Sequence, residues 1–263
     1  MDKKKIMSKR NNWGGFRDLL GVIGAFVILF VLLSVLPETS SKFLTSNNLF
    51  NVARQITVNI ILSCGLTMAI LIGGIDLSVG SIIAISGCLL GGLITNNGMN
   101  VWAAILIGIL SGVLFGAFNG LVISRTNIPP FIVTLATMNI GRGIVRIYTG
   151  TDTILINNET FTYIGSGRLF GVIPVHVVYI IAICVIGWFI LNRTKLGRHI
   201  YAVGDNEQAA LFTGINVRRV KFMVYVLVGL FAALAGVVLA ARTSSGLYTA
   251  GEGSVSYTHL FRV

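Results

Sequence analysis

The sequence predicts an all-α fold, a polytopic integral membrane bundle of helices, and three observations lead to that prediction. Residues 55–124 contain a single charged side chain, that of Asp76, with long apolar runs on both sides. Hydrophobic residues make up 54% of the chain and charged residues only 11%, whereas a soluble domain carries about 25% charged residues. The apolar runs are long enough to cross a hydrocarbon core of about 30 Å, which takes about 20 residues of helix. One membrane domain is therefore the expected unit, and an ordinary soluble domain is excluded.

The predicted spans are separated by residues that stop or start helices. Pro37 ends the first span and the pair Gly73-Gly74 ends the second, because both residue types have low helix propensity. A Thr-Asn-Asn-Gly sequence at 95–98 divides an apolar stretch that is too long for one crossing, and Pro129-Pro130 suits the start of the next helix. The predicted spans lie at residues 19–36, 56–72, 77–94, 101–123, 131–148, 170–191 and 222–241.

The N-terminal segment, residues 1–18, is basic and precedes an apolar run, as in a signal peptide. That run is too long for the apolar region of such a peptide, and no small-residue cleavage site follows it. We therefore expect a retained first span, with residues 1–18 as a cytoplasmic N-terminus and residues 19–253 as the transmembrane domain.

The distribution of lysine and arginine agrees with this number of spans. If the N-terminus is cytoplasmic, then Asp76, the turn at 124–127 and the loop at 192–221 are cytoplasmic as well. Cytoplasmic segments of membrane proteins carry an excess of basic residues. We expect a multi-pass protein of the bacterial plasma (inner) membrane. Its cytoplasmic cations would be Arg125, Arg193, Lys195, Arg198, Arg218, Arg219 and Lys221, against Lys42, Arg54, Arg168 and Arg242 outside.

The formal net charge of +11 comes from segments that flank apolar runs. We interpret these basic residues as contacts for anionic membrane lipid and not for nucleic acid. The three cysteines lie inside apolar runs without metal-ligand spacing, and the three histidines are scattered. The sequence has no G-x-x-x-x-G-K-S/T phosphate-binding string, no H-E-x-x-H and no G-x-S-x-G. We therefore expect no metal site, no cofactor, no catalytic residue and no enzyme activity in the chain itself.

Asp76 stands in the string Gly-Gly-Ile-Asp-Leu-Ser-Val-Gly-Ser at residues 73–81. A carboxylate among apolar runs costs at least about 2.5 kcal/mol unless it is solvated or paired. Two roles fit it: a turn residue that caps the next helix at the membrane surface, or a residue that lines a solute path. Further candidates for that path are polar side chains inside spans, although helix packing uses the same residue types. They are Asn59, Thr67, Asn119, Thr134, Thr137, Asn139 and Arg142.

Glycines at positions 108, 112, 116 and 120 are spaced by four and so share one face of the fourth span. Small residues on one face let membrane helices approach closely, because lipid offers no hydrophobic drive for helix association. The pattern predicts a tightly packed bundle and is common to many transporters.

The loop at 192–221 contains a predicted short helix of about two turns. Asp205 or Asn206 can cap its N-terminus, Glu207 favours the positive end of the helix dipole, and Gly214 suits the stop. Small and large apolar residues stand side by side on it, a shape that fits a groove of another protein. An interfacial helix that only tucks under the bundle is the alternative. The segment comprises Asp205, Asn206, Glu207, Gln208, Ala209, Ala210, Gly214 and Ile215.

Three segments of the chain carry a family resemblance. The first is the string at 73–81, and the second is Thr-x-Leu-Gly-Arg-x-Ile-Tyr-Ala-x-Gly-x-Asn-Glu-x-Ala-Ala-x-x-x-Gly-Ile at 194–215. The third runs from Ala235-Gly236 to Thr249-Ala250-Gly251. Together and in this order they resemble the permease subunit of bacterial ribose-type ABC sugar importers. The resemblance covers nearly the whole chain, to about Gly253, and leaves the sugar undetermined.

The resemblance implies an importer in which two permease subunits, identical or paralogous, form the pathway for a monosaccharide such as ribose. Two ABC ATPase subunits would bind ATP and dock on the cytoplasmic side, and an extracytoplasmic sugar-binding protein would deliver the sugar. The helix at 206–214 would be the coupling helix that receives motion from the ATPase. The family has Glu-Ala-Ala-x-x-x-Gly there, but Glu207 is seven residues before Gly214 and Gln208 holds the place six before it. Because of this departure, the role of the family's glutamate does not carry over directly to Glu207. The expected docking function of the helix is unaffected.

After Gly253 the family pattern ends. The resemblance calls for further spans, completing about ten helices, whereas residues 254–263 resemble a foreign tail at a truncation point. We expect that the 263-residue chain as written is not a competent transporter. A stand-alone channel or ion-coupled secondary carrier is the alternative function, since an intramembrane carboxylate between broken helices also fits it. The loop at 192–221 distinguishes the two, because a stand-alone carrier needs no docking helix.

Overall fold

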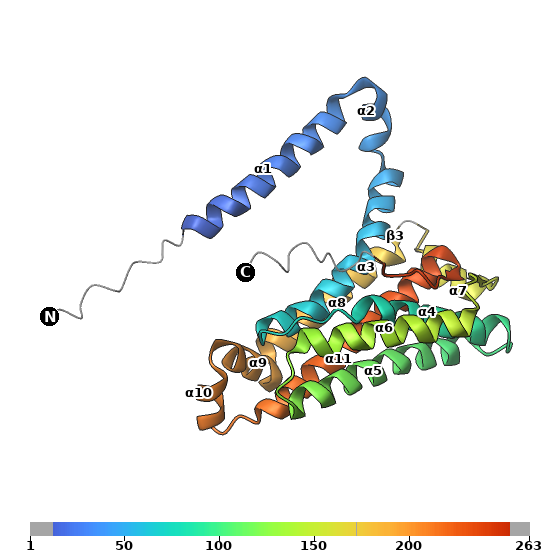
Figure 1. The fold of residues 1–263 in the computed structure, drawn as a ribbon. Coiled ribbons are helices and arrows are strands. Elements are labelled where there is room, and N and C mark those ends of the chain that lie inside the picture. The colour runs from blue at the N-terminus through green and yellow to red at the C-terminus, as the bar shows by residue number, and fades with distance from the viewer. Residues whose placement is uncertain (1–12, 172, 253–263) are drawn as a thin grey trace. The chain divides into compact units, whose positions relative to one another are not determined.

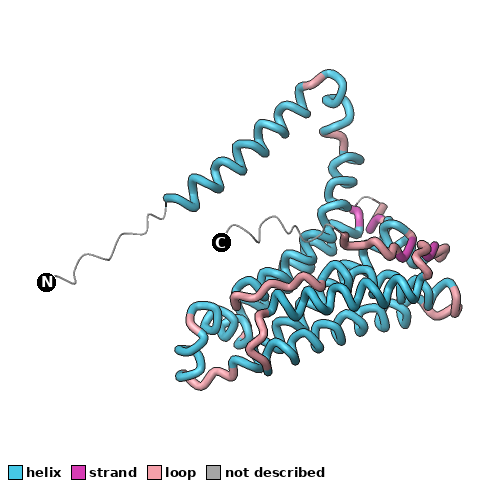
Figure 2. Tube along the Cα trace, in the orientation of Figure 1, coloured by secondary structure: helices cyan, strands magenta, loops and turns pink. Residues whose placement is uncertain are grey.

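The computed structural model describes residues 13–171 and 173–252, and it confirms the all-α prediction. Helices make up most of the chain, and its strands are two residues each (Figure 2). The chain divides into two compact units, residues 1–52 and 53–263. The tail at 254–263 lies outside the described residues, as does most of the predicted basic N-terminus.

The first unit contains α1 (Trp13–Val35), α2 (Pro37–Phe43) and the beginning of α3 (Ser46–Leu71). Pro37 stands in the first turn of α2, where its missing N–H costs no hydrogen bond. The rings of Phe30 and Phe43 meet edge to face, with centroids 5.4 Å apart, and so hold α1 against α2.

The second unit holds the remaining elements (Figure 1). Two short antiparallel pairs, β1 with β4 and β2 with β3, join loops at one end of its helices. The helices are α4 (Val79–Thr95), α5 (Val101–Arg125), α6 (Pro130–Thr149), α7 (Glu159–Ser166), α8 (Val175–Arg193), α9 (Lys195–Asp205), α10 (Glu207–Phe212) and α11 (Val217–Thr243). The strands are β1 (Ile154–Leu155), β2 (Arg168–Leu169), β3 (Ile173–Pro174) and β4 (Ser245–Gly246).

Each predicted span coincides with a helix of 17 residues or more: α1, α3, α4, α5, α6, α8 and α11. Within the described residues, four of these (α3, α5, α8 and α11) are long and apolar enough to cross a membrane by length and composition. Several boundaries differ from the prediction: α1 begins at Trp13 and α11 at Val217, each earlier than the predicted span. α3 begins at Ser46 because its polar first turns contain no helix breaker, and α8 begins at Val175 because β2 and β3 occupy the residues before it.

The glycine face of α5 packs against α11, as the spacing predicts. A side chain at Gly112 would meet Ala233 Cβ at 2.5 Å and the Gly229 carbonyl oxygen at 2.8 Å, and one at Gly116 would meet the Tyr225 carbonyl. The two backbones are therefore in direct contact, and no larger residue fits between them. The opposite face of α5 exposes Leu106, Leu110, Leu114 and Phe118, which suits contact with lipid.

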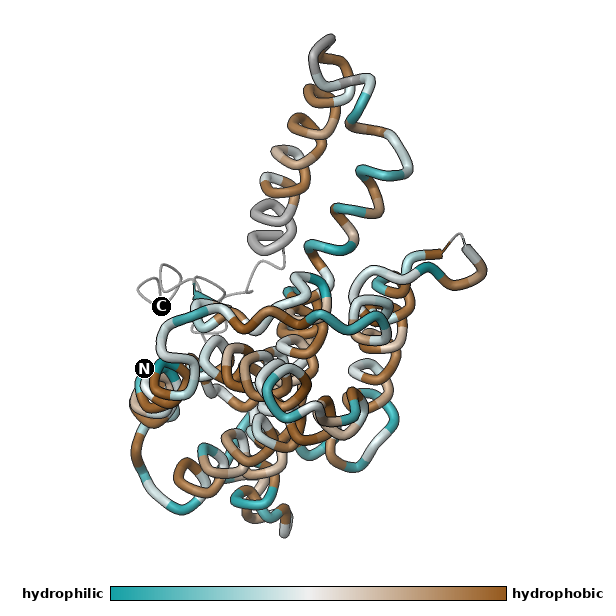
Figure 3. Tube along the Cα trace, turned by 90° about the vertical axis from the view of Figure 1, so that its right-hand side faces the viewer, coloured by the Kyte–Doolittle hydropathy of each residue, from teal (hydrophilic) through white to brown (hydrophobic). Residues whose placement is uncertain are grey.

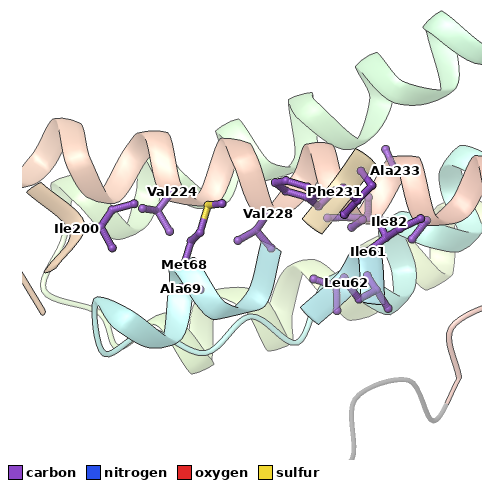
Figure 4. Close-up of a cluster of buried hydrophobic side chains, with 14 of the residues drawn as sticks. Ile61, Leu62, Met68, Ala69, Ile82, Ile200, Val224, Val228, Phe231 and Ala233 are labelled. Atoms are coloured by element: carbon purple, nitrogen blue, oxygen red, sulfur yellow. The ribbon is translucent and has the colours of Figure 1, made fainter. Parts of the chain in front are cut away.

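A hydrophobic cluster joins α3, α4, α9 and α11, with Met68, Ile82, Ile200 and Val228 among its members (Figure 4). The side chains of α4 are buried over almost its whole length, so this helix lies at the centre of the second unit. Hydrophobic residues, brown in Figure 3, run along the helices of that unit. The exposed apolar surface of this unit is the one expected of membrane helices, because their outer side faces lipid.

Candidate functional site

The turn between α3 and α4, residues 72–78, begins with a glycine-based helix stop. Gly73 has a φ of +74°, which favours glycine. The Gly73 N–H donates to the Ile70 carbonyl at 2.9 Å, and the Gly74 N–H donates to the Ala69 carbonyl at 2.8 Å. This pair of bonds is a Schellman motif, which satisfies the last carbonyls of α3.

The carboxylate of Asp76 closes the second half of the turn. Its Oδ1 accepts a hydrogen bond from the Ser78 N–H at 2.8 Å and another from the Ser78 hydroxyl at 2.6 Å. The Ser78 Oγ in turn accepts a hydrogen bond from Asn119 Nδ2, on α5, at 2.9 Å. All three side chains are buried. Asp76 therefore acts as a turn residue and, through Ser78, ties the start of α4 to α5.

Three buried polar atoms in this region have no hydrogen-bond partner among the described residues: Asp76 Oδ2, Asn119 Oδ1 and Tyr225 Oη. The Tyr225 hydroxyl, on α11, lies against Gly74, where a side chain would collide with it. Burial raises the pKa of Asp76 to about 6, and the two hydrogen bonds from Ser78 oppose that rise. A protonated Asp76 carboxyl would be able to donate a hydrogen bond. Asn119 Oδ1, an acceptor without a partner among the described residues, belongs to the same cluster.

Helix α6 also holds the turn. The hydroxyl of Thr134, on α6, donates toward the Ile75 carbonyl at 3.2 Å and toward its own helix at Pro130. The turn at 72–78 is thus in contact with α5 through Asn119, with α6 through Thr134 and with α11 through Tyr225. The turn thus finds hydrogen-bond partners for its polar backbone inside the protein, as a membrane environment requires.

Arg142, on α6, holds the segment that follows α11. Its guanidinium donates to the Ala250 carbonyl at 2.7 Å and to the Tyr248 carbonyl at 3.2 Å. The same segment lies against α4, because a side chain at Gly80 would meet the Gly251 carbonyl at 2.6 Å. Non-helical backbone is therefore packed beside α4, where its carbonyls are paired with a cation.

The polar residues predicted for a solute path do not form one group. Asp76 and Asn119 come together through Ser78, and Arg142 binds the segment at 248–250. Asn59 and Asn139 are exposed, and the Asn139 amide donates to Leu135 of its own helix. The role of these five residues in a solute path stays a prediction.

The loop at 192–221 contains two helices, of which the sequence predicted the second. Asn206 joins them directly: its N–H donates to the Ala202 carbonyl of α9 at 3.2 Å, and its Oδ1 accepts from the Ala209 N–H of α10 at 2.9 Å. Asn206 is thus the N-cap of α10, and Asp205 is the last residue of α9. Gly214 ends the turn after α10 with a φ of +82°.

α10 is held to the bundle by its first turn. Both carboxylate oxygens of Glu207 accept hydrogen bonds from Lys221 Nζ, on α11, at 2.8 Å. Ala210 is buried, whereas Leu211 is 48% exposed and Phe212 is 89% exposed. The helix therefore presents two large apolar side chains outward from a fixed base.

A groove of about 570 Å³ lies beside α10. It is bounded by the turn between α5 and α6, by α10 and by the start of α11, with Arg125, Glu207, Arg218 and Lys221 in its walls. The structure thus places the turn at 124–127 at the same end of the bundle as α10. Arg125, Arg218 and Lys221 lie at this end of the bundle, while the side of the membrane that this end faces stays a prediction.

Comparison with known proteins assigns the chain to a family. Residues 48–257 match the family described as branched-chain amino acid transport system, permease component. The chain belongs to this permease family. The Ribose import permease protein RbsC of Bacillus subtilis (strain 168) is 42% identical over 239 residues, covering 90% of this chain and 74% of the relative. The predicted resemblance to ribose-type permeases is thereby confirmed.

Other relatives of this permease are named for ribose or for another sugar. RbsC of Escherichia coli (strain K12) is 38% identical over 87% of this chain and 72% of its own. The D-allose transport system permease protein AlsC of the same strain is 36% identical over 89% of this chain and 72% of its own. No solved structure is a significant match. The relatives are transport permeases, and this chain is a multi-pass protein of the same kind.

Reasoning from the sequence missed several parts of the site. Ser78 stands two residues after Asp76, a spacing typical of a side-chain-closed turn, so this signal was present in the sequence. Nothing local points to Tyr225 or to the contacts of Arg142, because their partners are distant in the chain. Within residues 13–171 and 173–252, no three His, Cys, Asp or Glu side chains are grouped to hold a metal ion.

Proposed function

We propose that this permease forms the translocation pathway of an ATP-driven importer for a monosaccharide such as ribose, and that α10 docks on a separate ABC ATPase subunit. The observation that carries the proposal is the pair of exposed apolar side chains, Leu211 and Phe212, on a short helix whose base is fixed. A helix that only tucked under the bundle would turn its apolar residues inward. Aromatic side chains that project from a surface are typical anchors of protein interfaces.

Energy for uptake would come from the partner. The sequence lacks the lysine-bearing phosphate loop that ATP binding needs, so ATP would be bound by the ATPase and this chain would need no cofactor. An extracytoplasmic binding protein would supply the sugar, and a second permease copy, identical or paralogous, would complete the pathway. The relatives named for ribose and allose support a monosaccharide as the solute.

The end of the bundle that carries α9 and α10 would face the cytoplasm, with the N-terminus on the same side of the membrane. Cations around the groove beside α10 support this orientation, because basic residues mark cytoplasmic segments. They also suit the anionic lipid of the inner leaflet. The docking segment is the one predicted from the sequence, Asp205 to Ala210 with Gly214 and Ile215.

The docking assignment is tested by co-purification with the ATPase. Replacing Phe212 with aspartate places a charge on the exposed tip of α10 and should abolish co-purification without unfolding the permease. Tyr201, on α9, is 47% exposed and is the matched control. Tyr201→Asp should leave the complex intact. Retention of the ATPase by Phe212→Asp and by Gly214→Trp would refute the assignment.

The substrate assignment is tested by uptake of radiolabelled D-ribose in cells that express the permease with its ATPase and binding protein. Unlabelled ribose should compete, and a branched-chain amino acid should not. Competition by leucine in place of sugars would refute the choice of a monosaccharide.

A further inference from the structure

α9 is in backbone contact with the end of α3. A side chain at Gly204 would collide with the Leu71 carbonyl oxygen, and it would lie 3.7 Å from the Ile72 Cα. Two backbones meet here with no side chain between them. The turn at 72–78 starts at the next residue, so α9 touches the chain where α3 ends and that turn begins.

The apolar side of α9 is anchored at the same place. Ile200 and Val203 are buried in the hydrophobic cluster that contains Met68 of α3 and Val224 of α11. Figure 4 shows Ile200 beside Val224, with Met68 close by. α9 therefore cannot shift along the bundle without carrying the end of α3 with it, because packed side chains resist sliding.

α10 and α9 are also joined without a flexible linker. Asn206 is at once the C-cap of α9 and the N-cap of α10, with hydrogen bonds to both helices. Ala210 of α10 is buried in the cluster that holds Ile200. A force on the exposed tip of α10 would thus reach Gly204 through two helices that share a residue.

We propose that α9 presses against the chain where α3 meets the α3–α4 turn, and that it transmits displacements of α10 through this turn to α4 and α5. Asp76 is the positioning residue that keeps the turn rigid. The inference rests on the proposed docking of an ATPase at α10. It assigns to Gly204 and Asp76 roles in coupling, separate from docking itself.

The need for a positioning residue follows from the composition of the turn. Gly73 and Gly74 have no side chains, and the first half of the turn is held to α3 by the hydrogen bonds from their N–H groups to the Ile70 and Ala69 carbonyls. The Oδ1 of Asp76 restrains the other half through Ser78, which is bound to Asn119. A displacement at Leu71 then moves the start of α4 together with α5.

The first experiment compares two glycine variants of the full chain by hydrogen exchange, with and without the ATPase and a non-hydrolysable ATP analogue. Gly204→Ala forces α9 away from Leu71. Gly143→Ala is the matched control, because this helical glycine has open space around its α-carbon. ATPase docking should change deuterium uptake in residues 73–81 by at least about twofold in the wild type and in Gly143→Ala. Gly204→Ala should lose this response while residues 207–213 stay protected.

The second experiment separates the hydrogen-bonding role of Asp76 from its charge. Asp76→Asn keeps a carbonyl oxygen that can accept from Ser78, and Asp76→Leu does not. The asparagine variant should retain the response at 73–81, and the leucine variant should lose it with α10 still protected. A response in Asp76→Leu or in Gly204→Ala equal to that of the wild type would overturn the proposal.

The outcomes also distinguish the two levels of the argument. If α10 gains no protection from the ATPase in the wild type, the proposed docking fails and this inference fails with it. If α10 is protected but residues 73–81 do not respond in the wild type, docking stands and only the coupling route through Gly204 and Asp76 is overturned.

Discussion

Replacing Asp76 with asparagine should remove an acid-range pH dependence from the stability of the permease. The carboxyl lies in the turn at 72–78 and is 1% exposed. Burial raises its pKa from 3.8 to about 6, against the opposing effect of the hydrogen bonds from Ser78. Asparagine has nearly the same shape and keeps an acceptor for Ser78, but it cannot ionise.

The sign and size of the effect follow from the two pKa values. A raised pKa means that the folded state binds the proton more tightly than the unfolded state does. The stability that Asp76 contributes is therefore greatest below the unfolded pKa of 3.8, falls as the pH rises, and is lost above the folded pKa of about 6. A shift of about two units corresponds to about 3 kcal/mol. Most of this, about 2–3 kcal/mol, should appear between about pH 4 and about pH 7.

The measurement is the free energy of unfolding in mixed micelles, at about pH 4 and at about pH 7. It is made for the wild type and for Asp76→Asn. The wild type should lose about 2–3 kcal/mol more than the variant on going to the higher pH. Asp152→Asn is the control, because Asp152 is exposed. Equal pH dependence in the wild type and Asp76→Asn would show that the carboxyl is solvated or paired in solution, against the buried geometry.

Three other changes test the packing and the polar contacts. Gly116→Ala should destabilise the fold by about 1–3 kcal/mol, because its Cβ would collide with α11, and Gly143→Ala should be neutral in the same thermal unfolding assay. Arg142→Met should cost about 1.5–3 kcal/mol by removing charged donors from two carbonyls, with faster hydrogen exchange in residues 248–252. Lys221→Met should change stability by less than about 1 kcal/mol, because the pair with Glu207 is partly exposed, but it should weaken ATPase co-purification by loosening α10.

Helix positions could be predicted from this sequence because the lipid environment makes the signal strong. An apolar run of sufficient length has few other structures available to it, so α4 at 79–95 falls within two residues of the predicted 77–94. The short helix α10 was also predictable, since Asn206 and Gly214 are local cap signals. Hydropathy says nothing about polar helix turns, and for that reason the first ten residues of α3 were not expected.

The polar contacts of the site could not be derived in the same way. Asn119 reaches Ser78 across 41 residues of sequence and Arg142 reaches Ala250 across 108. Such pairs depend on how helices pack, and the sequence restricts that packing only through the glycine face. The amphipathic helix α9 was hidden for another reason: its basic, polar residues resemble those of a loop.

The packing at the centre of the second unit explains why a push on one turn would be transmitted and not dissipated. α5 and α11 meet backbone to backbone at Gly116 and Gly229, and the Ser86 hydroxyl of α4 donates to the Ala233 carbonyl of α11 at 3.3 Å. Helices in such contact have no flexible side chains between them to take up a small shift, so they move together. The turn at 72–78 is fastened to this body through Asn119, and α9 touches the chain just before it, at Leu71. Changes inside the body should therefore lower stability. Gly204→Ala should lower it as well, because its Cβ would collide with the Leu71 carbonyl, but this variant should in addition uncouple docking from movement of the turn.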